Sequence, residues 1–145
     1  MTVAGEQKIA APPSRVWFLL TDDASLPKCL PGCEKLERIN GDSFRLTMKV
    51  GLGAVSGSYT GTVRLSEKQP ESHLRLMVES RGGWGFLQGD GALELSEQDG
   101  ATLVRYTGEE NIGGMIASVG SRLLESAARL IINQFFQNLA QQATA

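Results

Sequence analysis

The sequence contains few residues that could bind a metal ion. It has two cysteines and a single histidine. A zinc site requires about four nitrogen or sulfur ligands, and His73 lies far along the chain from Cys29 and Cys33. We therefore expect no metal site and no cofactor. The two thiols flank a Pro-Gly turn and are expected to be structural, because a free cysteine behaves as a small buried hydrophobe; redox chemistry is the alternative.

The sequence also lacks an excess of basic residues and any long apolar run. Its formal net charge is −2, its pI is near 5.4, and its lysines and arginines are scattered. Nucleic-acid binding depends on clustered positive charge, so nucleic acid is excluded as a partner. No run approaches the roughly 20 apolar residues of a membrane span, and no signal peptide follows Met1. We expect one domain over residues 1–145, in the cytoplasm.

Side chains suited to catalysis are equally scarce at the positions expected to face inward. His73 follows a turn without a visible partner, so we interpret it as a surface residue and not as a general base. The segment 82–85 lacks the lysine and the serine or threonine of a phosphate-binding loop. The sequence therefore predicts no catalytic residue. Acidic residues fall mainly at turns or outward positions, as expected of a solvated surface: Glu34, Glu37, Asp42, Glu67, Glu71, Glu97 and Asp99.

What the sequence does contain is a long series of alternating segments. Over residues 43–50, for example, Phe44 and Met48 share one face while Arg45 and Lys49 point away. The same reasoning, with the turn signals between segments, predicts two short helices over residues 14–20 and 23–29, the second capped by the Asp22-Asp23 pair. It predicts strands over residues 5–10, 33–39, 43–50, 55–65, 74–83, 86–96 and 101–109.

The last thirty residues predict one long helix that opens at Gly113-Gly114. The free N–H groups there could also meet a ligand carbonyl or an anion, although helix entry is the favoured interpretation. One apolar face is expected to pack on the sheet: Ile116, Val119, Leu123, Ala127, Leu130 or Ile131, Phe135 and Leu139. The sequence thus predicts an α+β fold, in which a seven-stranded curved antiparallel sheet grips a long C-terminal helix around an apolar cavity.

Several spaced motifs resemble one known family over nearly the whole chain. They comprise residues 11–17 (Ala-Pro-Pro-Ser-Arg-Val-Trp), 30–34 (Leu-Pro-Gly-Cys-Glu), the glycine-rich turn over 51–57, and residues 112–123. In order and spacing they resemble the CoxG family of carbon monoxide dehydrogenase, part of the START and Bet v 1-like helix-grip superfamily. The resemblance implies the helix-grip fold.

The resemblance also implies a function without turnover. Members of this family are accessory proteins encoded with molybdenum-dependent carbon monoxide dehydrogenases and related hydroxylases. Their proposed roles are recruitment of the oxidoreductase to the cytoplasmic membrane and binding of a lipophilic quinone. The implied partners are an apolar small molecule, quinone or lipid, and subunits of the molybdenum hydroxylase. Longer relatives continue to a hydrophobic C-terminal anchor beyond the position of residues 141–145, so we expect any membrane contact here to be peripheral.

Alternation and helical phase give the residues expected to line the cavity and bind the ligand: Trp17, Leu20, Phe44, Met48, Tyr59, Leu76, Trp84, Tyr106, Met115, Val119, Leu123 and Ala127. Trp84, among glycines, could instead be a gate, a membrane contact or plain packing. Two other functions stay open. One is a polyketide cyclase or aromatase-like enzyme with Tyr59 or Tyr106 as the acid. The other is a docking or assembly protein whose own side chains fill the cavity.

Overall fold

The chain folds into a curved antiparallel sheet that packs against helices on one face. The computed structural model describes residues 1–51 and 55–145, so part of the predicted glycine-rich turn lies outside the described residues. Within that part of the chain the elements are β1 (Thr2–Ile9), α1 (Pro13–Thr21), α2 (Leu26–Cys29), β2 (Cys33–Asn40), β3 (Ser43–Val50), β4 (Gly57–Gln69), β5 (His73–Gly82), β6 (Gly85–Gln98), β7 (Ala101–Gly114), the 3₁₀ helix η2 (Met115–Val119) and α3 (Ser121–Ala143).

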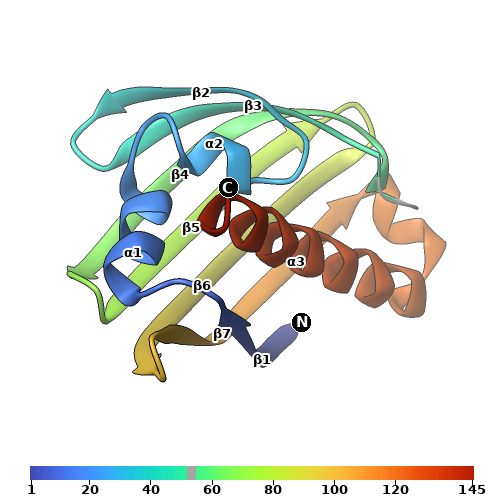
Figure 1. Ribbon diagram of the computed structural model, residues 1–145. Coiled ribbons are helices and arrows are strands. Elements are labelled where there is room, and N and C mark those ends of the chain that lie inside the picture. Colours follow the sequence, from blue (N-terminus) through green and yellow to red (C-terminus); the bar gives the residue numbers. More distant parts are fainter. Residues whose placement is uncertain (52–54) are drawn as a thin grey trace.

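The seven strands follow the order β1-β7-β6-β5-β4-β3-β2. Strands β2 to β7 each pair with the next in sequence, which confirms the predicted meander, and β1 closes the far edge by pairing with β7. Figure 1 shows α3 lying across the concave face of the sheet, with α1 and α2 beside its C-terminal half. The predicted helix-grip fold is therefore confirmed.

The core lies between this concave face and the helices. The alternation in β3 places Phe44, Leu46, Met48 and Val50 inside, each buried, as predicted. Leu139 of α3 is fully buried on the opposite side of this core. Burial of this kind contributes about 25 cal/mol for each Å² of apolar surface removed from water. This core holds the helix against the sheet at the end where α1 and α2 lie.

Strand β4 approaches β5 closely at Gly61. A Cβ atom built on Gly61 would lie 1.8 Å from the carbonyl oxygen of Glu79, so no other residue fits at this position. Before α2, the Asp22 carboxylate accepts hydrogen bonds from the backbone N–H groups of Ala24 and Ser25. Asp22 therefore stabilises the turn over residues 23–25 and not the helix, which begins only at Leu26 after the N-cap Ser25 and has no side-chain cap, so the predicted cap by Asp22-Asp23 is wrong.

The prediction that the long helix opens at Gly113-Gly114 is wrong. Both glycines belong to β7, where Gly114 pairs with Gly85 of β6. The two strands approach so closely here that a Cβ on Gly85 would lie 2.0 Å from the Gly113 carbonyl oxygen. The glycines therefore serve strand pairing, and α3 begins only after Gly120, whose φ of +100° interrupts the helical path.

The buried face of α3 follows the predicted one except near the start of the helix. Leu124, and not Leu123, faces the core, and Leu123 is 53% exposed. Of the alternatives Leu130 and Ile131, Leu130 is exposed and Ile131 packs against the core, and Ala127, Phe135 and Leu139 are buried as predicted. The exposed Val119 and Leu123 lie on either side of Gly120, where the backbone leaves the helical path. Ile116 is nevertheless buried, but in η2 and not in α3.

Candidate functional site: an apolar cavity under the long helix

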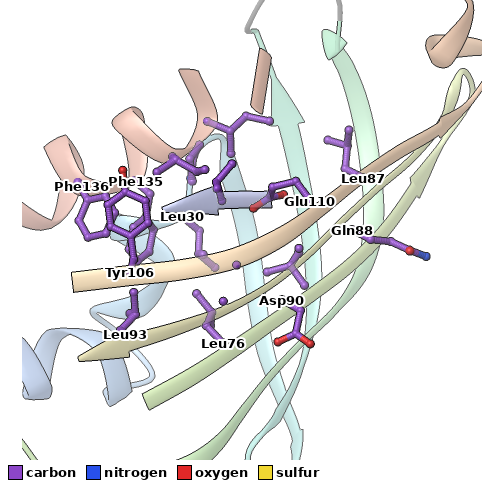
Figure 2. A pocket seen from close by; sticks show the side chains of 18 of the residues that line it. Leu30, Leu76, Leu87, Gln88, Asp90, Leu93, Tyr106, Glu110, Phe135 and Phe136 are labelled. Carbon is purple, nitrogen blue, oxygen red and sulfur yellow. The ribbon is translucent and has the colours of Figure 1, made fainter. Parts of the chain in front are cut away.

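A cavity lies between α3 and the middle of the sheet. It has a volume of about 160 Å³ and is partly open. Its wall is formed by apolar side chains of β3, β5, β6, β7 and α3, together with Val3 and the Leu30–Pro31 segment. Figure 2 shows Phe135 and Phe136 of α3 on one side of the cavity and Leu76 and Leu93 of the sheet across from them. The site is therefore built to hold an apolar group.

Glycine residues in the sheet, which have no side chain, leave the space of the cavity open. The inward positions of β6 include Gly89 and Gly91, and Gly91 pairs directly with Gly108 of β7. On the neighbouring strand the partners of Gly91 and Gly89 are Leu76 and Val78, which reach the cavity from the side. Three adjacent positions of the concave face thus carry no side chain, and α3 spans the gap above them.

An aromatic cluster closes one end of the cavity. The Tyr106 and Phe136 rings lie 4.9 Å apart, centroid to centroid, and Phe135 meets Phe136 edge-on at 5.2 Å. The Tyr106 hydroxyl lies over the backbone of Gly5 in β1, since a Cβ built there would be 2.5 Å from the hydroxyl oxygen. Pairs of this geometry stabilise by about 1 kcal/mol beyond their burial. The cluster fixes α3 to the sheet beside the cavity.

Of the side chains predicted to line the cavity, Met48, Leu76 and Tyr106 lie on its wall. Their contact with a ligand stays a prediction. Other predicted residues are placed elsewhere and do not line it: Leu20, Phe44, Tyr59 and Ala127 are buried in the surrounding core, and Trp17 is half-buried against that core. Alternation identifies the inner face of a strand correctly, but not the stretch where the helix leaves room.

The prediction that Trp84, Met115, Val119 and Leu123 line the cavity is wrong. All are exposed, Trp84 by 61% and Met115 by 67%. Trp84 stands at the β5–β6 turn, where its carbonyl oxygen accepts a hydrogen bond from the N–H of Ile116. This bond joins the turn to η2, which carries Met115 and Val119, and Leu123 follows in the first turn of α3, so all four exposed side chains lie outside the cavity. We call these four residues the apolar tip.

Glu110 is a cavity residue that the sequence reasoning missed. It belongs to β7, which continues to Gly114 and not to residue 109 as predicted. Glu110 therefore keeps the inward phase of Val104, Tyr106 and Gly108, and this uninterrupted alternation is the signal that could have found it. Burial among apolar groups raises the pKa of its carboxyl to about 7, although the positive charge of the N-terminus acts in the opposite direction.

Charged side chains on the convex face form a separate network. The Arg75 guanidinium donates to both carboxylate oxygens of Asp90, at 2.8 and 2.5 Å, and to Glu67. Arg75 thereby holds the pKa of Asp90 below its usual range. The sequence predicts no partner for His73, but its ring contacts Glu94 and Glu67, and the hydrogen bond with Glu94 is the main cause that raises its pKa. Neighbouring strands bring these residues together, which sequence spacing could not reveal.

The two cysteines are free thiols at the helical end of the molecule. Cys29 is buried and Cys33 half-buried, and burial raises the pKa of Cys29 to about 11. Burial also raises the pKa of Cys33, so both cysteines are mainly in the protonated thiol form near neutral pH. Residues 1–51 and 55–145 contain no group of three histidine, cysteine or acidic side chains arranged to hold a metal ion. Among the helices of these same segments, none combines the length and apolar character needed to cross a bilayer.

Comparisons with known proteins agree with the fold. The family model that describes CoxG of carbon monoxide dehydrogenase matches residues 5–144. No curated protein matches the chain. Among solved structures, a conserved protein from Geobacillus kaustophilus is similar, with 30% identity, a TM-score of 0.93, and coverage of 99% of this chain and 95% of that one.

More distant structures share the fold alone. A START superfamily protein from Mycobacterium smegmatis has a TM-score of 0.77 at 11% identity, covering 99% of this chain and 97% of its own. A protein from Thermus thermophilus has a TM-score of 0.75 at 19% identity, covering 99% of this chain and 97% of its own. The seven-stranded sheet with its long C-terminal helix is thus shared across sequences that differ at most positions.

Proposed function

This chain belongs to the CoxG family of carbon monoxide dehydrogenase, and we propose on that premise that it carries a quinone or lipid for a molybdenum hydroxylase. The family is one of accessory subunits, and the START-like fold is typical of proteins that bind hydrophobic ligands. In the proposed role the chain performs no turnover. It shelters an apolar molecule, contacts the cytoplasmic membrane peripherally, and assists either recruitment of the hydroxylase or electron transfer from it.

The observation that carries this proposal is the apolar cavity under α3. Its volume of about 160 Å³ is close to the roughly 150 Å³ of an engineered protein cavity that binds benzene. Such a space accepts a single ring but not a long isoprenoid chain. Because the cavity is partly open, the ring of a quinone can occupy it while the tail extends outward along the opening.

The apolar tip supports the membrane part of the proposal. Trp84, Met115 and Val119 expose large apolar side chains on two segments joined by a hydrogen bond, and Leu123 exposes another in the first turn of α3. A compact group of exposed apolar residues that includes a tryptophan is typical of surfaces that enter the boundary between lipid headgroups and acyl chains. Contact there would let an apolar ligand pass between bilayer and protein without crossing water.

The other two hypotheses have weaker support. Tyr59 donates its hydroxyl to the Val55 carbonyl at 2.7 Å and does not line the cavity, so it is not available as an acid there. The Tyr106 hydroxyl lies over Gly5. A docking protein with a filled interior conflicts with the open volume beneath α3. Hydrophobic-ligand carriage is therefore the function that the geometry favours.

The test begins with native mass spectrometry of freshly purified protein, followed by solvent extraction and identification of any released molecule. Gly91→Leu is the informative variant, because a Cβ at Gly91 meets nothing closer than 3.6 Å and the new side chain would enter the cavity. Ala92→Leu, on the opposite face of the same strand, is its matched control. We expect the wild type and Ala92→Leu to release and rebind a quinone or lipid, and Gly91→Leu to do neither. Equal ligand content in all three proteins would refute binding in this cavity.

The membrane contact and the enzyme partner need separate tests. Flotation with vesicles of anionic phospholipid should recover the wild type, and Trp84→Ala should reduce that recovery several-fold. Affinity capture from the native host should retain molybdenum hydroxylase subunits. If the wild type does not float with the vesicles, only the membrane contact is removed from the proposal. If affinity capture retains no hydroxylase subunit, the hydroxylase is removed as the partner.

A further inference from the structure

The cavity contains one acidic group that the proposed role does not yet use. Glu110 projects from β7 into the space above Gly89, and a Cβ built on Gly89 would lie 3.0 and 3.1 Å from its two carboxylate oxygens. Figure 2 shows the Glu110 carboxylate on the side of the sheet that carries Leu30 and Phe135, whereas the Asp90 carboxylate points to the other side. A glycine has thus left room for a carboxyl group inside an apolar wall.

No other side chain of the described residues forms a hydrogen bond or ion pair with this carboxyl group. The neighbouring acids are engaged on the convex face: Asp90 pairs with Arg75, and Glu109 accepts a hydrogen bond from the Thr2 hydroxyl. Among the described residues no side-chain oxygen is both fully buried and unpaired, so this largely buried carboxyl keeps some contact with the open space of the cavity. A molecule that fills the space removes this contact, and a polar group left unpaired costs about 1 to 3 kcal/mol. Because the carboxyl lies inside the space proposed for the ligand, a bound molecule is the natural source of its missing partner.

The groups that face Glu110 favour its uncharged form. From α3 the cavity receives only Ile131, Ile132, Phe135 and Phe136, none of which titrates. The α-amino group of Met1 is the charged group on the β1 side, where it donates to the Glu110 backbone carbonyl at 3.0 Å and forms an ion pair with Glu109 at 3.5 Å.

On the strand side the surroundings are equally apolar. On β6, Gly89 lies directly opposite Glu110, and Leu87 is the next residue along the same face. The Tyr106 hydroxyl is turned toward Gly5. The carboxyl therefore sits in a medium of low polarity, with one positive charge at its backbone end. A neutral carboxyl has an O–H that it can donate, and a carboxylate has not.

We propose that Glu110 selects the ligand, by donating a hydrogen bond from its protonated carboxyl to a carbonyl or hydroxyl oxygen on an otherwise apolar molecule. This inference rests on the proposed function, because it names the chemistry that the cavity recognises. A ring with carbonyl oxygens satisfies the carboxyl and fills the apolar space. A pure hydrocarbon of the same shape leaves the carboxyl without a partner, and a site of that kind rejects such analogues strongly.

The test compares duroquinone, a 1,4-benzoquinone with a methyl group on every ring carbon other than the two carbonyl carbons, with durene, the benzene that carries the same methyl groups and no oxygen. Isothermal titration calorimetry of the full chain at pH 5.5 and pH 8.5 measures both affinities. With a carboxyl pKa of about 7, roughly one molecule in thirty is protonated at pH 8.5. We therefore expect the Kd for duroquinone to rise about thirtyfold between the two pH values, and the Kd for durene to stay constant or fall at low pH.

Variants separate the hydrogen bond from the shape of the cavity. Glu110→Gln keeps a donor at every pH, so it should bind duroquinone with the acid-form affinity of the wild type at both pH values. Glu110→Leu should bind duroquinone about tenfold more weakly and durene at least as tightly as the wild type. Glu109→Gln, the neighbour on the convex face, is the control and should match the wild type. Urea unfolding of each variant verifies that it is folded.

The outcomes distinguish this inference from the proposed function. If duroquinone and durene bind the wild type and Glu110→Leu alike, with no dependence on pH, the role of Glu110 is refuted while ligand binding in the cavity stands. Tighter duroquinone binding at pH 8.5 than at pH 5.5 would also refute it. If neither compound binds the wild type at any pH, both the proposed function and this inference fall.

Discussion

Replacing Glu110 with glutamine should stabilise the folded chain above pH 7 and change its stability little below pH 4.5. Glutamine has nearly the same shape as the protonated side chain, so the cavity wall is preserved. What the substitution removes is the requirement to ionise inside an apolar space. The effect is therefore confined to the pH range in which the folded and unfolded chains differ in protonation.

The magnitude follows from the two pKa values of this carboxyl. It titrates at about 7 in the folded chain and at its ordinary value of 4.5 when unfolded. Between these values the folded chain holds a proton that the unfolded chain has lost, so wild-type stability falls as pH rises through this range. Since one pKa unit corresponds to about 1.4 kcal/mol, Glu110→Gln should gain about 3 kcal/mol above pH 7.

Urea unfolding followed by far-ultraviolet circular dichroism, from pH 4 to pH 8.5, measures this difference. Glu109→Gln is the matched control, because its carboxylate lies on the convex face and the Thr2 hydroxyl lowers its pKa. Its removal should weaken the fold slightly above pH 4.5, which is the opposite sign. A constant difference between wild type and Glu110→Gln across the whole range would refute the placement of a buried, titrating Glu110.

Three further outcomes follow from other parts of the structure. Because Glu94 raises the pKa of His73, the protonated His73 contributes to the stability of the fold below about pH 6.5. This contribution is lost as pH rises through the pKa of His73 in the folded chain. His73→Ala should therefore cost about 0.5 kcal/mol more at pH 5.5 than at pH 9 in the same urea assay. Phe136→Ala removes a buried ring and should cost about 3 to 5 kcal/mol, seen as a lower Tm. Iodoacetamide at pH 8, followed by mass spectrometry, should label Cys33 well before Cys29, and the reverse order would contradict the burial of Cys29.

The strands could be predicted from the sequence because their alternation is local. A period of two residues assigns Phe44, Met48 and Leu76 to the concave face, and each lies there. The hairpin turns supply the order of pairing. The position of β1 beside β7 depends on residues far apart along the chain, and no local pattern specifies such a contact.

The beginning of α3 could not be predicted from the spacing of apolar residues. Gly113 and Gly114 are as compatible with tight strand pairing as with helix entry, and only the approach of β6 decides between them. Because the start of the helix is displaced, the predicted face holds from Ala127 onward, but Met115, Val119 and Leu123 around Gly120 are assigned to the wrong side. A pattern in a helix is informative only when the helix is continuous.

The cavity itself depends on which positions lacking a side chain come together in the folded sheet. The sequence shows Gly89, Gly91 and Gly108 as glycines within strands, but only the register brings them together beneath α3. Glu110 illustrates the remaining difficulty. The predicted strand ends at residue 109, although the alternation continues through Glu110 to Gly114.

The pairing of β1 with β7 has a consequence for how the protein matures. Thr2 meets Glu109 across the sheet, so the N-terminal strand can find its partner only after most of the chain has been synthesised. The helix that roofs the cavity is later still, beginning at Ser121. Contacts between such distant segments form late and slow folding. There is thus no enclosed space to fill until β7 and α3 have both been synthesised and the sheet has closed.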